Sequence, residues 1–589
     1  MKSFFKVLLA SVLGVFIAFM FIFFIFLGII GVMISSADKP VEVGPNTVLH
    51  MKLDQPVVDR ASKNPFDGFD YLNMRPVSRT GLYDILENIE KAKKDDNIEG
   101  IFIEISFPQA GISTLGEIRD ALEDFRESGK FILAYADYYT QGAYYLASVA
   151  DHVYLTPTGQ VMWAGLRSEI MFYKGALEKL GLEPQIIRHG EFKSAVEPFM
   201  YDRMSDENRE QVNTYLFSIW NVIVEGVSRT RGIPAGRLDE IADRALVRSS
   251  EAALEHGLVD ELLYRDQVLS RLRELAGLEE DDDIKSVSIA QYTRVPKKRE
   301  GRGLPREKLA IVFAEGAIGP GEGSELSIGS VRISRALREA RKDTTVKAIV
   351  FRVNSPGGSA LDSEVIWREV ELAANEKPVI VSMGDLAASG GYYIAAPATK
   401  IVANPHTITG SIGVFGLLLD ASGFLNEKLG ITVDVAKTNE FADMGSIYRP
   451  LTPDEREILQ QGVEDVYRVF TQRVAEGRGI DVARVDEIGQ GRVWSGYDAR
   501  ELGLVDEYGG LTRAVELAVE EAGLEYYRVL SLPTQKDPFE ELLKNLGGSV
   551  RMRLAGDLPG SMSRHMETLR TALENQGIQA RMPFDMVVY

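Results

Sequence analysis

Short, nearly continuous apolar runs alternate along most of the chain with segments whose apolar residues recur at helical spacing. One apolar run covers residues 348–353, and after it Ile366, Val370, Ala373 and Ala374 follow the i, i+4, i+7, i+8 pattern of one helix face. Apolar strands of this kind are typical of a parallel sheet that is buried on both faces. The alternation of strands and helices predicts an α/β fold.

The amino terminus carries a different pattern, an uncharged and strongly apolar run from Val7 to Ile34 that follows Lys2 and Lys6. As a helix this run could span about 42 Å, against a hydrocarbon core of about 30 Å. It is also longer than the apolar core of a cleaved signal peptide, which has about 7 to 15 residues. We interpret residues 1–37 as a membrane anchor, and the two lysines predict that the body lies outside the cytoplasm.

The body of the chain repeats itself. Residues 98–111, I-E-G-I-F-I-E-I-S-F-P-Q-A-G, align with residues 346–359, V-K-A-I-V-F-R-V-N-S-P-G-G-S. At the same offset and without a gap, G-A-Y-Y-L-A at 142–147 then aligns with G-G-Y-Y-I-A at 390–395. Self-similarity of this kind predicts a duplicated domain.

We assign residues 47–265 to a first repeat and residues 308–530 to a second. Residues 266–307 hold an acidic run and a basic, glycine-bearing run, which predict a solvated linker. Residues 531–589 are left as a C-terminal extension with a possible helix at 540–546.

Ser389 lies at the centre of the stretch D-L-A-A-S-G-G-Y-Y, residues 385–393, between an apolar run and a predicted helix start. Unpaired N–H groups at a helix start stabilise negative charge nearby. A second glycine turn, N-S-P-G-G-S at 354–359, follows the other apolar run. Two glycine turns at the ends of neighbouring strands can direct two N–H groups at one point, as an oxyanion hole requires. We therefore interpret Ser389 as a catalytic nucleophile.

Comparison of the two repeats points to a base for this serine. The first repeat has Gln141 at the position of Ser389, so the turn does not need serine in order to fold. Conversely, H-G-E-F-K-S-A at 189–195 aligns with T-N-E-F-A-D-M, so Lys193 corresponds to Ala442. A neutral amine can accept a serine proton, and burial among apolar neighbours lowers the pKa of a lysine. Lys193 is the predicted general base, and a complete site needs both repeats.

The amino-acid composition limits the classes of ligand and of catalytic chemistry that we expect. The chain has 66 basic and 86 acidic residues, a net charge of -20 and no basic stripe, so nucleic acid is not expected to bind. The absence of cysteine excludes disulfides and thiol catalysis. No phosphate-binding glycine loop or clustered set of metal ligands stands out, so no cofactor is expected. A Ser-His-Asp triad is a weaker alternative, because His406, the nearest histidine to the second-repeat motifs, has Thr158 at its first-repeat position.

Four motifs, G-E-F-K-S-A-V-E-P-F, N-S-P-G-G-S, A-A-S-G-G-Y-Y and T-G-S-I-G-V, together resemble those of the signal peptide peptidase A family in its long, two-repeat form. This family, also called protease IV, consists of serine peptidases with a Ser-Lys dyad. The resemblance extends from the anchor to about residue 530. It implies that Ser389 is the nucleophile and Lys193 the general base, that the N–H groups of Gly358 and Gly390 form the oxyanion hole, and that Ser411 orients the lysine amine.

The resemblance also implies two tandem repeats with a crotonase- or Clp-protease-like fold after an N-terminal transmembrane helix. It implies a location in the bacterial inner (cytoplasmic) membrane, with the catalytic body in the periplasm, and assembly as a homotetramer. The substrates that it implies are peptides, namely signal peptides left in the membrane after cleavage from preproteins.

Two other functions stay open at this point. One is a crotonase-like enzyme that acts on coenzyme A thioesters, although the paired glutamates that such an enzyme needs are not found near the glycine turns. The other is a catalytically silent scaffold, which would fail to react at Ser389 with a serine-directed fluorophosphonate.

Overall fold

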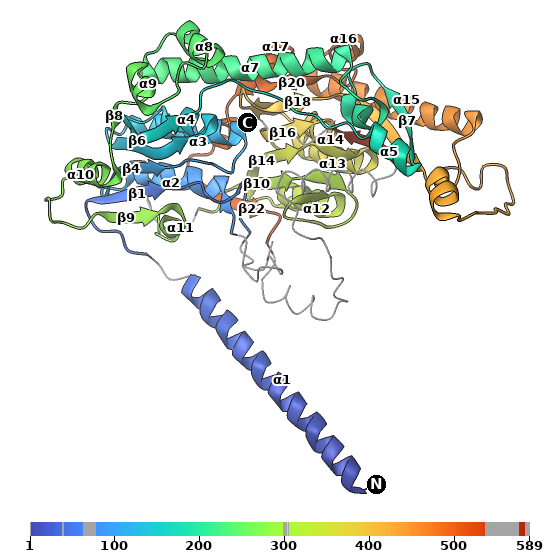
Figure 1. Cartoon of the computed structure of the whole chain (residues 1–589), viewed down its shortest axis with the longest axis horizontal. Helices are drawn as coiled ribbons and strands as arrows, with labels where there is room; N and C mark the ends of the chain where they lie inside the picture. Colours follow the sequence, from blue (N-terminus) through green and yellow to red (C-terminus); the bar gives the residue numbers. More distant parts are fainter. Residues whose placement is uncertain are drawn as a thin grey trace.

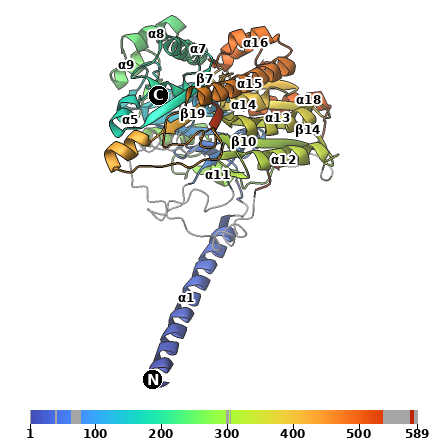
Figure 2. The ribbon, with the colours of Figure 1, turned by 90° about the vertical axis from the view of Figure 1, so that its right-hand side faces the viewer.

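The computed structural model describes residues 2–37, 41–62, 78–297, 303, 305–535 and 577–582. A long helix, α1 (Lys2–Ala37), leads to a body in which two largely parallel sheets lie next to each other (Figure 1). Figure 2 shows α1 projecting from one side of this body. The α/β class predicted from the apolar pattern is confirmed.

The first sheet is built by the first repeat together with β9 of the segment 266–307. It is parallel throughout, in the order β8-β6-β5-β4-β1-β9. Parallel strands covered on both faces have near-continuous apolar runs, and β4 follows this rule with five buried residues out of seven. The strands are β1 (Thr47–Met51), β4 (Ile98–Glu104), β5 (Phe131–Tyr139), β6 (His152–Val161), β8 (Glu261–Leu262) and β9 (Lys285–Ser288).

The second sheet has the order β20-β18-β16-β14-β10-β22, with β17 and β21 joined to it through β16. All its pairs are parallel except β18 with β20. The strands are β10 (Lys308–Glu315), β14 (Val346–Ser355), β16 (Val379–Ala388), β17 (Lys400–Ala403), β18 (Ile408–Gly410), β20 (Val493–Ser495), β21 (Glu507–Tyr508) and β22 (Arg528–Leu532).

The strands and helices of the two repeats are separated by the same number of residues that separates Ile98 from Val346 in the sequence alignment. Strands β14, β16 and β17 follow β4, β5 and β6 at this same interval, counted from the first residue of each strand. Helix α13 (Ala360–Ala374) follows α3 (Ile112–Arg126) at the same interval. In α13 the predicted apolar face is buried at Ile366, Val370 and Ala373. The two repeats are therefore copies of one structural unit.

A third sheet joins the repeats, in the order β12-β13-β11-β15-β23-β19-β7. Its edge strand β7 belongs to the first repeat and pairs antiparallel with β19 of the second, and β23 comes from the C-terminal extension. This sheet was not predicted from the sequence. Its strands are β7 (Glu183–His189), β11 (Ala317–Gly319), β12 (Gly323–Ser324), β13 (Ser327–Gly329), β15 (Gly357–Ser359), β19 (Val414–Asp420) and β23 (Gly577–Arg581), while β2 (Val57–Val58) and β3 (Thr80–Gly81) form a separate pair.

Helices cover the sheets, and some pack across the boundary between the repeats. Helix α7 (Asp206–Arg231) of the first repeat contacts β20, and α3 contacts β16. Buried apolar residues of both repeats, such as Leu115 and Ala388, belong to one cluster. The other helices are α2 (Leu82–Lys94), α4 (Gln141–Ala147), α5 (Lys174–Leu180), α6 (Glu197–Met200), α8 (Ala235–Asp243), α9 (Ser250–Glu255), α12 (Ser330–Lys342), α14 (Gly390–Ala395), α15 (Pro453–Arg478), α16 (Val482–Ile488), α17 (Gly496–Glu501) and α18 (Leu511–Ala522), with a 3-10 turn at Ser194–Val196 and a π-helical turn at Phe424–Lys428.

Much of the segment that the sequence assigns to a linker, 266–307, is folded onto the first repeat. It contains most of α10 (Arg265–Leu275), all of β9 and the short helix α11 (Ile289–Tyr292). Val268, Leu272 and Tyr292 are buried there, so a few apolar residues outweigh the surrounding charges. The possible helix at 540–546 lies outside the described residues.

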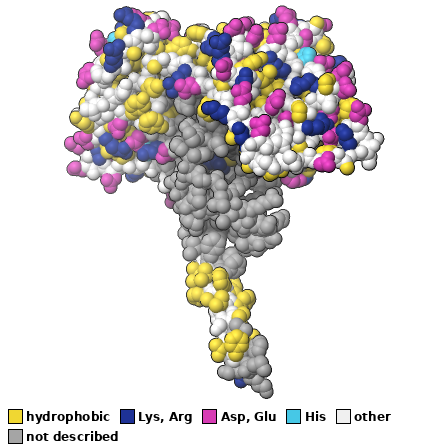
Figure 3. All heavy atoms as spheres, turned by 45° about the vertical axis from the view of Figure 1, so that its right-hand side comes forward, with side chains coloured by type: hydrophobic (Ala, Val, Ile, Leu, Met, Phe, Trp, Pro, Cys, Tyr) yellow, Lys and Arg dark blue, Asp and Glu magenta, His cyan; other side chains and the backbone are white. Residues whose placement is uncertain are grey.

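Helix α1 runs without interruption over 36 residues. Phe4, Val12 and Phe21 are among its exposed large hydrophobic side chains, and Figure 3 shows apolar atoms on its surface. None of the helices, over the residues that the structure describes, is long and apolar enough to cross a membrane, and the side chains of residues 26–37 within α1 lie outside that set.

Candidate active site

Ser389 occupies the tight turn between β16 and α14. Its backbone angles are φ 56° and ψ -116°, a combination that costs a residue other than glycine about 1–3 kcal/mol. The turn is held because the Ser389 N–H donates to the carbonyl of Gly410 at 2.8 Å. The side chain is fully buried. The strand, turn and helix start expected at Ser389 are all present.

Lys193 comes from the first repeat, just before the 3-10 turn, and reaches the serine of the second. Its Nζ lies 2.9 Å from Ser389 Oγ, 3.1 Å from Ser411 Oγ and 3.2 Å from the Ser411 carbonyl oxygen. The lysine is fully buried, and burial lowers its pKa well below the usual value. The structure therefore brings Ser389, Lys193 and Ser411 together.

These distances fit a neutral amine. A neutral amine has two N–H groups and one lone pair, and the two oxygens of Ser411 can accept both N–H groups. The lone pair is then left for the hydroxyl proton of Ser389. The hydroxyl of Ser411 donates in turn to the Gly491 carbonyl at 3.3 Å, which fixes its own orientation. This arrangement can remove a proton from Ser389 Oγ.

A loop at 489–492 holds the backbone of Lys193, and sequence reasoning missed it. A Cβ on Gly491, where φ is +82°, would lie 2.6 Å from the Cβ of Lys193, so only glycine fits this contact. The neighbouring Gln490 carbonyl accepts the N–H of Phe192 at 3.0 Å. The signal in the sequence, I-G-Q-G-R, is a pair of glycines in the other repeat, and nothing in it points to the lysine as a partner.

The glycine turn of β15 meets the Ser389 turn. A Cβ on Gly357 would lie 2.8 Å from the Gly390 nitrogen, and a Cβ on Gly390 would lie 3.2 Å from the Gly358 nitrogen. The nitrogen atoms of Gly358 and Gly390, the two predicted oxyanion-hole donors, therefore lie close together beside Ser389. Glycine at all three positions leaves room for this approach.

Strand β23 runs through the same place, although no role was predicted for the segment that contains it. It pairs antiparallel with β15 on one side, Ala580 opposite Gly358, and with β19 on the other. The Ala580 carbonyl oxygen lies 3.0 Å from the position that a Cβ of Gly390 would take. Met582 N–H donates to the Pro356 carbonyl at 2.6 Å. An extended peptide segment thus lies against the candidate site.

At the equivalent positions of the first repeat, the side chains make hydrogen bonds that hold the local structure. Gln141 Oε1 accepts the N–H groups of Ala164 and Gly165 at 3.1 and 3.0 Å. Trp163, the counterpart of Ser411, donates its indole N–H to the Leu238 carbonyl at 2.9 Å. The first repeat therefore supplies the lysine but holds no second copy of the serine arrangement.

His406 does not take part in this arrangement. Its Nδ1 lies 2.6 Å from Asn404 Oδ1, and its ring packs edge-on against Tyr145. Burial lowers its pKa to about 3, so the ring is neutral. Within the described part of the chain, no group of three or more His, Asp or Glu side chains is placed to hold a metal ion.

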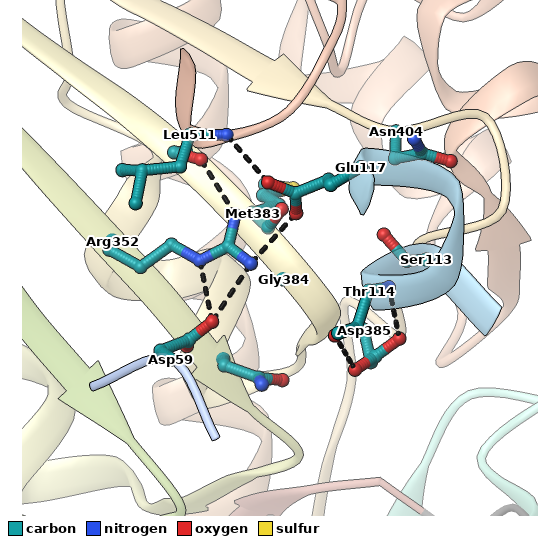
Figure 4. Close-up of polar contacts among 12 residues, drawn as sticks. Asp59, Ser113, Thr114, Glu117, Arg352, Met383, Gly384, Asp385, Asn404 and Leu511 are labelled. Carbon is teal, nitrogen blue, oxygen red and sulfur yellow. Dashed lines mark hydrogen bonds and ion pairs between the residues drawn. The ribbon is translucent and has the colours of Figure 1, made fainter. Parts of the chain in front are cut away.

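A buried charge network behind the site ties the two repeats together (Figure 4). Arg352 on β14 lies 2.8 Å from both Asp59 and Glu117, which come from the first repeat, and donates to the Met383 carbonyl at 3.1 Å. Burial alone would lower the pKa of Arg352, but the charges of Asp59 and Glu117 outweigh it and raise the pKa. The arginine therefore stays charged and joins α3 to two strands of the second sheet.

A second link in this network lies closer to the nucleophile. Asp385, four residues before Ser389, accepts hydrogen bonds from the N–H and the hydroxyl of Thr114 on α3, at 3.0 and 2.6 Å. Burial raises the pKa of Asp385. Strand β14 leads into the glycine turn, and β16 leads into Ser389. The first repeat therefore fixes the strand ends from which both turns begin, and it also supplies the lysine.

The family model for peptidase family S49 matches residues 124–279 and 371–525 of the chain, one segment in each repeat. "Protease 4" of Haemophilus influenzae is 37% identical over 511 residues, which are 82% of this chain and 83% of that protein. "Protease 4" of Salmonella typhi is 35% identical over 554 residues, 90% of this chain and 88% of that protein. "Serine protease SPPA, chloroplastic" of Arabidopsis thaliana is 34% identical over 522 residues, 87% of this chain and 76% of that protein.

Among solved structures, a ClpP1 mutant from Listeria monocytogenes covers 35% of this chain and 94% of its own, with 16% identity and a TM-score of 0.24. That score is too low to bear on the fold, so the α/β class rests on the sheets themselves. The family match and the relatives agree over both repeats. The chain therefore belongs to peptidase family S49 and is a serine-type protease.

Proposed function

We propose that the chain is a membrane-anchored serine endopeptidase with a Ser-Lys dyad, and that it degrades signal peptides left in the membrane after cleavage from preproteins. Ser389 is the nucleophile and Lys193 the general base. The observation that carries this proposal is the 2.9 Å separation between Lys193 Nζ and Ser389 Oγ in a fully buried setting. Burial lowers the pKa of the amine and so favours its neutral form, which is the form that accepts a proton.

In the acylation step, Ser389 Oγ attacks the carbonyl carbon of the scissile bond while Lys193 Nζ takes the hydroxyl proton. The negative charge that develops on the carbonyl oxygen is stabilised by the N–H groups of Gly358 and Gly390. The protonated Lys193 then gives its proton to the leaving amine. Water hydrolyses the resulting ester by the same route, with Lys193 again acting as the base.

The proposed anchor is residues 1–37, nearly all of which belong to helix α1. In a bilayer the exposed hydrophobic side chains of α1 would face lipid instead of water. Because it carries Lys2 and Lys6, the amino terminus stays in the cytoplasm. The body then lies in the periplasm, at the inner membrane of a bacterium.

Removal of residues 2–37 should move the protein from the membrane fraction to the soluble fraction after alkaline extraction.

The substrate class follows from this placement together with the resemblance to signal peptide peptidase A. A body held at the membrane surface is close to the peptides that remain in the bilayer after preprotein cleavage. Tethering of this kind raises the effective concentration of enzyme at such substrates.

A homotetramer is the proposed assembly, and one exposed segment supports contact with another copy. Residues 424–448 extend from the body at the right of Figure 1. A concentration of exposed apolar side chains on one segment is typical of an interaction surface. Light scattering in detergent should give four times 65.3 kDa for the protein component, and a Val435→Asp variant should reduce that mass. The exposed large side chains of the segment are Leu429, Ile431, Val433, Val435, Phe441, Met444 and Tyr448.

The test of the proposed activity uses the full chain in detergent with a synthetic signal peptide. Wild type should cleave the peptide and react with a fluorophosphonate probe, and Ser389→Ala should do neither. Ser363→Ala is the matched control, because Ser363 is also buried near the turn but donates to the Ser359 carbonyl. Labelling of Ser389→Ala at the wild-type rate would show that another serine is the nucleophile.

A further inference from the structure

We propose that Gln211 and Tyr467 are positioning residues for the general base, which hold the backbone around Lys193 so that its amine reaches Ser389. The proposal rests on the proposed function and deepens it by stating what keeps the two halves of the site in place. Gln211 lies on α7 of the first repeat, and Tyr467 lies on α15 of the second. Both act through Lys193 and not on the substrate.

Lys193 needs this support because it lies outside regular secondary structure. Its backbone, at φ -74° and ψ 75°, lies between strand β7 and the 3-10 turn at Ser194–Val196. Proton transfer depends on the 2.9 Å between Lys193 Nζ and Ser389 Oγ, at the end of a long side chain. Residues outside helices and strands are placed precisely only where neighbouring hydrogen bonds lock them. A displacement of about 1 Å can lower a rate about 100-fold.

The amide of Gln211 binds the chain on both sides of Lys193. Its Nε2 donates to the Phe192 carbonyl at 3.1 Å and to Ser194 Oγ at 2.7 Å. Its Oε1 accepts the N–H of Val493 on β20 at 3.1 Å. A carbonyl needs a donor and an N–H needs an acceptor, so these partners fix the orientation of the amide. This buried side chain therefore joins the lysine segment of the first repeat to a strand of the second.

Tyr467 holds the same segment from the second repeat. Its hydroxyl accepts the N–H of Gln490 at 3.2 Å and donates to Asp486 Oδ1 at 2.6 Å. Gln490 has a φ of 52°, which is uncommon for a residue other than glycine, and its carbonyl accepts the N–H of Phe192. The ring of Tyr467 stacks on His189, the last residue of β7, with 4.0 Å between the ring centroids. Tyr467 thus contacts the start of the lysine segment and the loop that packs against it.

The loop that Tyr467 holds also carries the partners of Ser411. The Ser411 N–H donates to the Arg492 carbonyl at 2.7 Å, and its hydroxyl donates to the Gly491 carbonyl. A shift of this loop would therefore move the base and the residue that orients it together. A loosened lysine segment also admits water, which raises the pKa of Lys193 from its depressed value toward the usual one.

The first test replaces Gln211 by methionine, which keeps the length of the side chain but makes none of its hydrogen bonds. In the full chain in detergent, Gln211→Met should lower kcat for a fluorogenic peptide about 10- to 100-fold at unchanged KM. The acid limb of the kcat/KM profile should move up by about one pH unit as water reaches Lys193. Gln185→Met is the matched control, because Gln185 is also a buried first-repeat glutamine that accepts a second-repeat N–H, that of Leu451 at 2.6 Å. It should keep the wild-type kcat and limb.

The second test removes a single hydroxyl. Tyr467→Phe keeps the ring that stacks on His189 but leaves the N–H of Gln490 without its acceptor. It should lower kcat about tenfold and move the acid limb in the same direction. Tyr144→Phe is the matched control, because it also removes a buried hydroxyl, one that donates to the Leu258 carbonyl at 2.8 Å within the first repeat. It should keep the wild-type kcat and limb.

The shift of the limb separates positioning from a merely structural role. A variant that only loses stability loses activity by the same factor at every pH, so a lower kcat with an unmoved limb and a lower melting temperature would overturn the proposal. If Gln211→Met does not fold, the limb of Tyr467→Phe decides. An inactive Lys193→Met beside fully active Gln211→Met and Tyr467→Phe would refute the positioning role and leave the proposed function standing. Activity retained by Lys193→Met would refute both.

Discussion

Lys193→Met is expected to lower kcat/KM for peptide hydrolysis by a factor of about 10⁴ or more, because the residues of a nucleophile–base pair act as a unit. Methionine keeps the length of the side chain but cannot accept a proton. The fold should not suffer. A buried lysine that is neutral in the folded state and charged in the unfolded state costs stability at every pH below its unfolded value near 10.4. Its removal should leave the melting temperature at pH 7 equal or higher.

The pH profile of the wild type gives a second readout of the same residue. Burial lowers the pKa of Lys193, so the active, neutral amine is present above that depressed pKa and is lost as pH falls through it. We therefore expect kcat/KM to rise to a plateau well below pH 10. The matched control is Lys91→Met, since Lys91 also has a pKa lowered by burial, to about 8, but contacts Tyr292 and Val295 far from the site. Activity that keeps rising toward pH 10 would contradict the assignment.

Gly358→Ala is expected to lower kcat by a factor of about 10² to 10³, the usual effect of removing one oxyanion-hole donor. The added Cβ would lie 2.1 Å from the backbone oxygen of Ile318, a contact that neither chain segment can relieve by turning a side chain. The turn must therefore shift and take its N–H away from the reacting oxygen. Burst kinetics with an activated ester measures the loss in the acylation step directly.

Gly319→Ala is the matched control for this change, because Gly319 lies on the neighbouring strand β11 with open space at its Cβ position. It should keep kcat within a few-fold of wild type. If Gly358→Ala keeps its kcat and its stability as Gly319→Ala does, the N–H of Gly358 is not an oxyanion donor.

The duplication could be read from the sequence because it left a constant offset. Helices α3 and α13 begin at Ile112 and Ala360, and the strands on either side of them are separated by the same interval. The approach of Lys193 to Ser389 could also be anticipated, since each repeat has kept a residue that the other has lost. The family match is consistent with the protease interpretation and not with the alternative of a crotonase-like enzyme.

Strand pairs and ion pairs between residues far apart in the chain could not be predicted from the sequence. Strands β15 and β23 have three and five residues, too few to show a periodicity, and they pair although they lie far apart in the chain. Arg352 lies within the apolar run of β14, and nothing local indicates that Asp59 and Glu117 will meet it. The folded part of residues 266–307 was missed because its buried residues are few and lie between charge runs.

The division of the site between the two repeats also has a consequence for biosynthesis. Lys193 is made 196 residues before Ser389, and Gly491, whose backbone packs against that lysine, is made later still. A growing chain therefore holds no complete site while the first repeat and most of the second emerge. An enzyme assembled in this way stays inert toward its own unfolded chain until most of the second repeat has been translated.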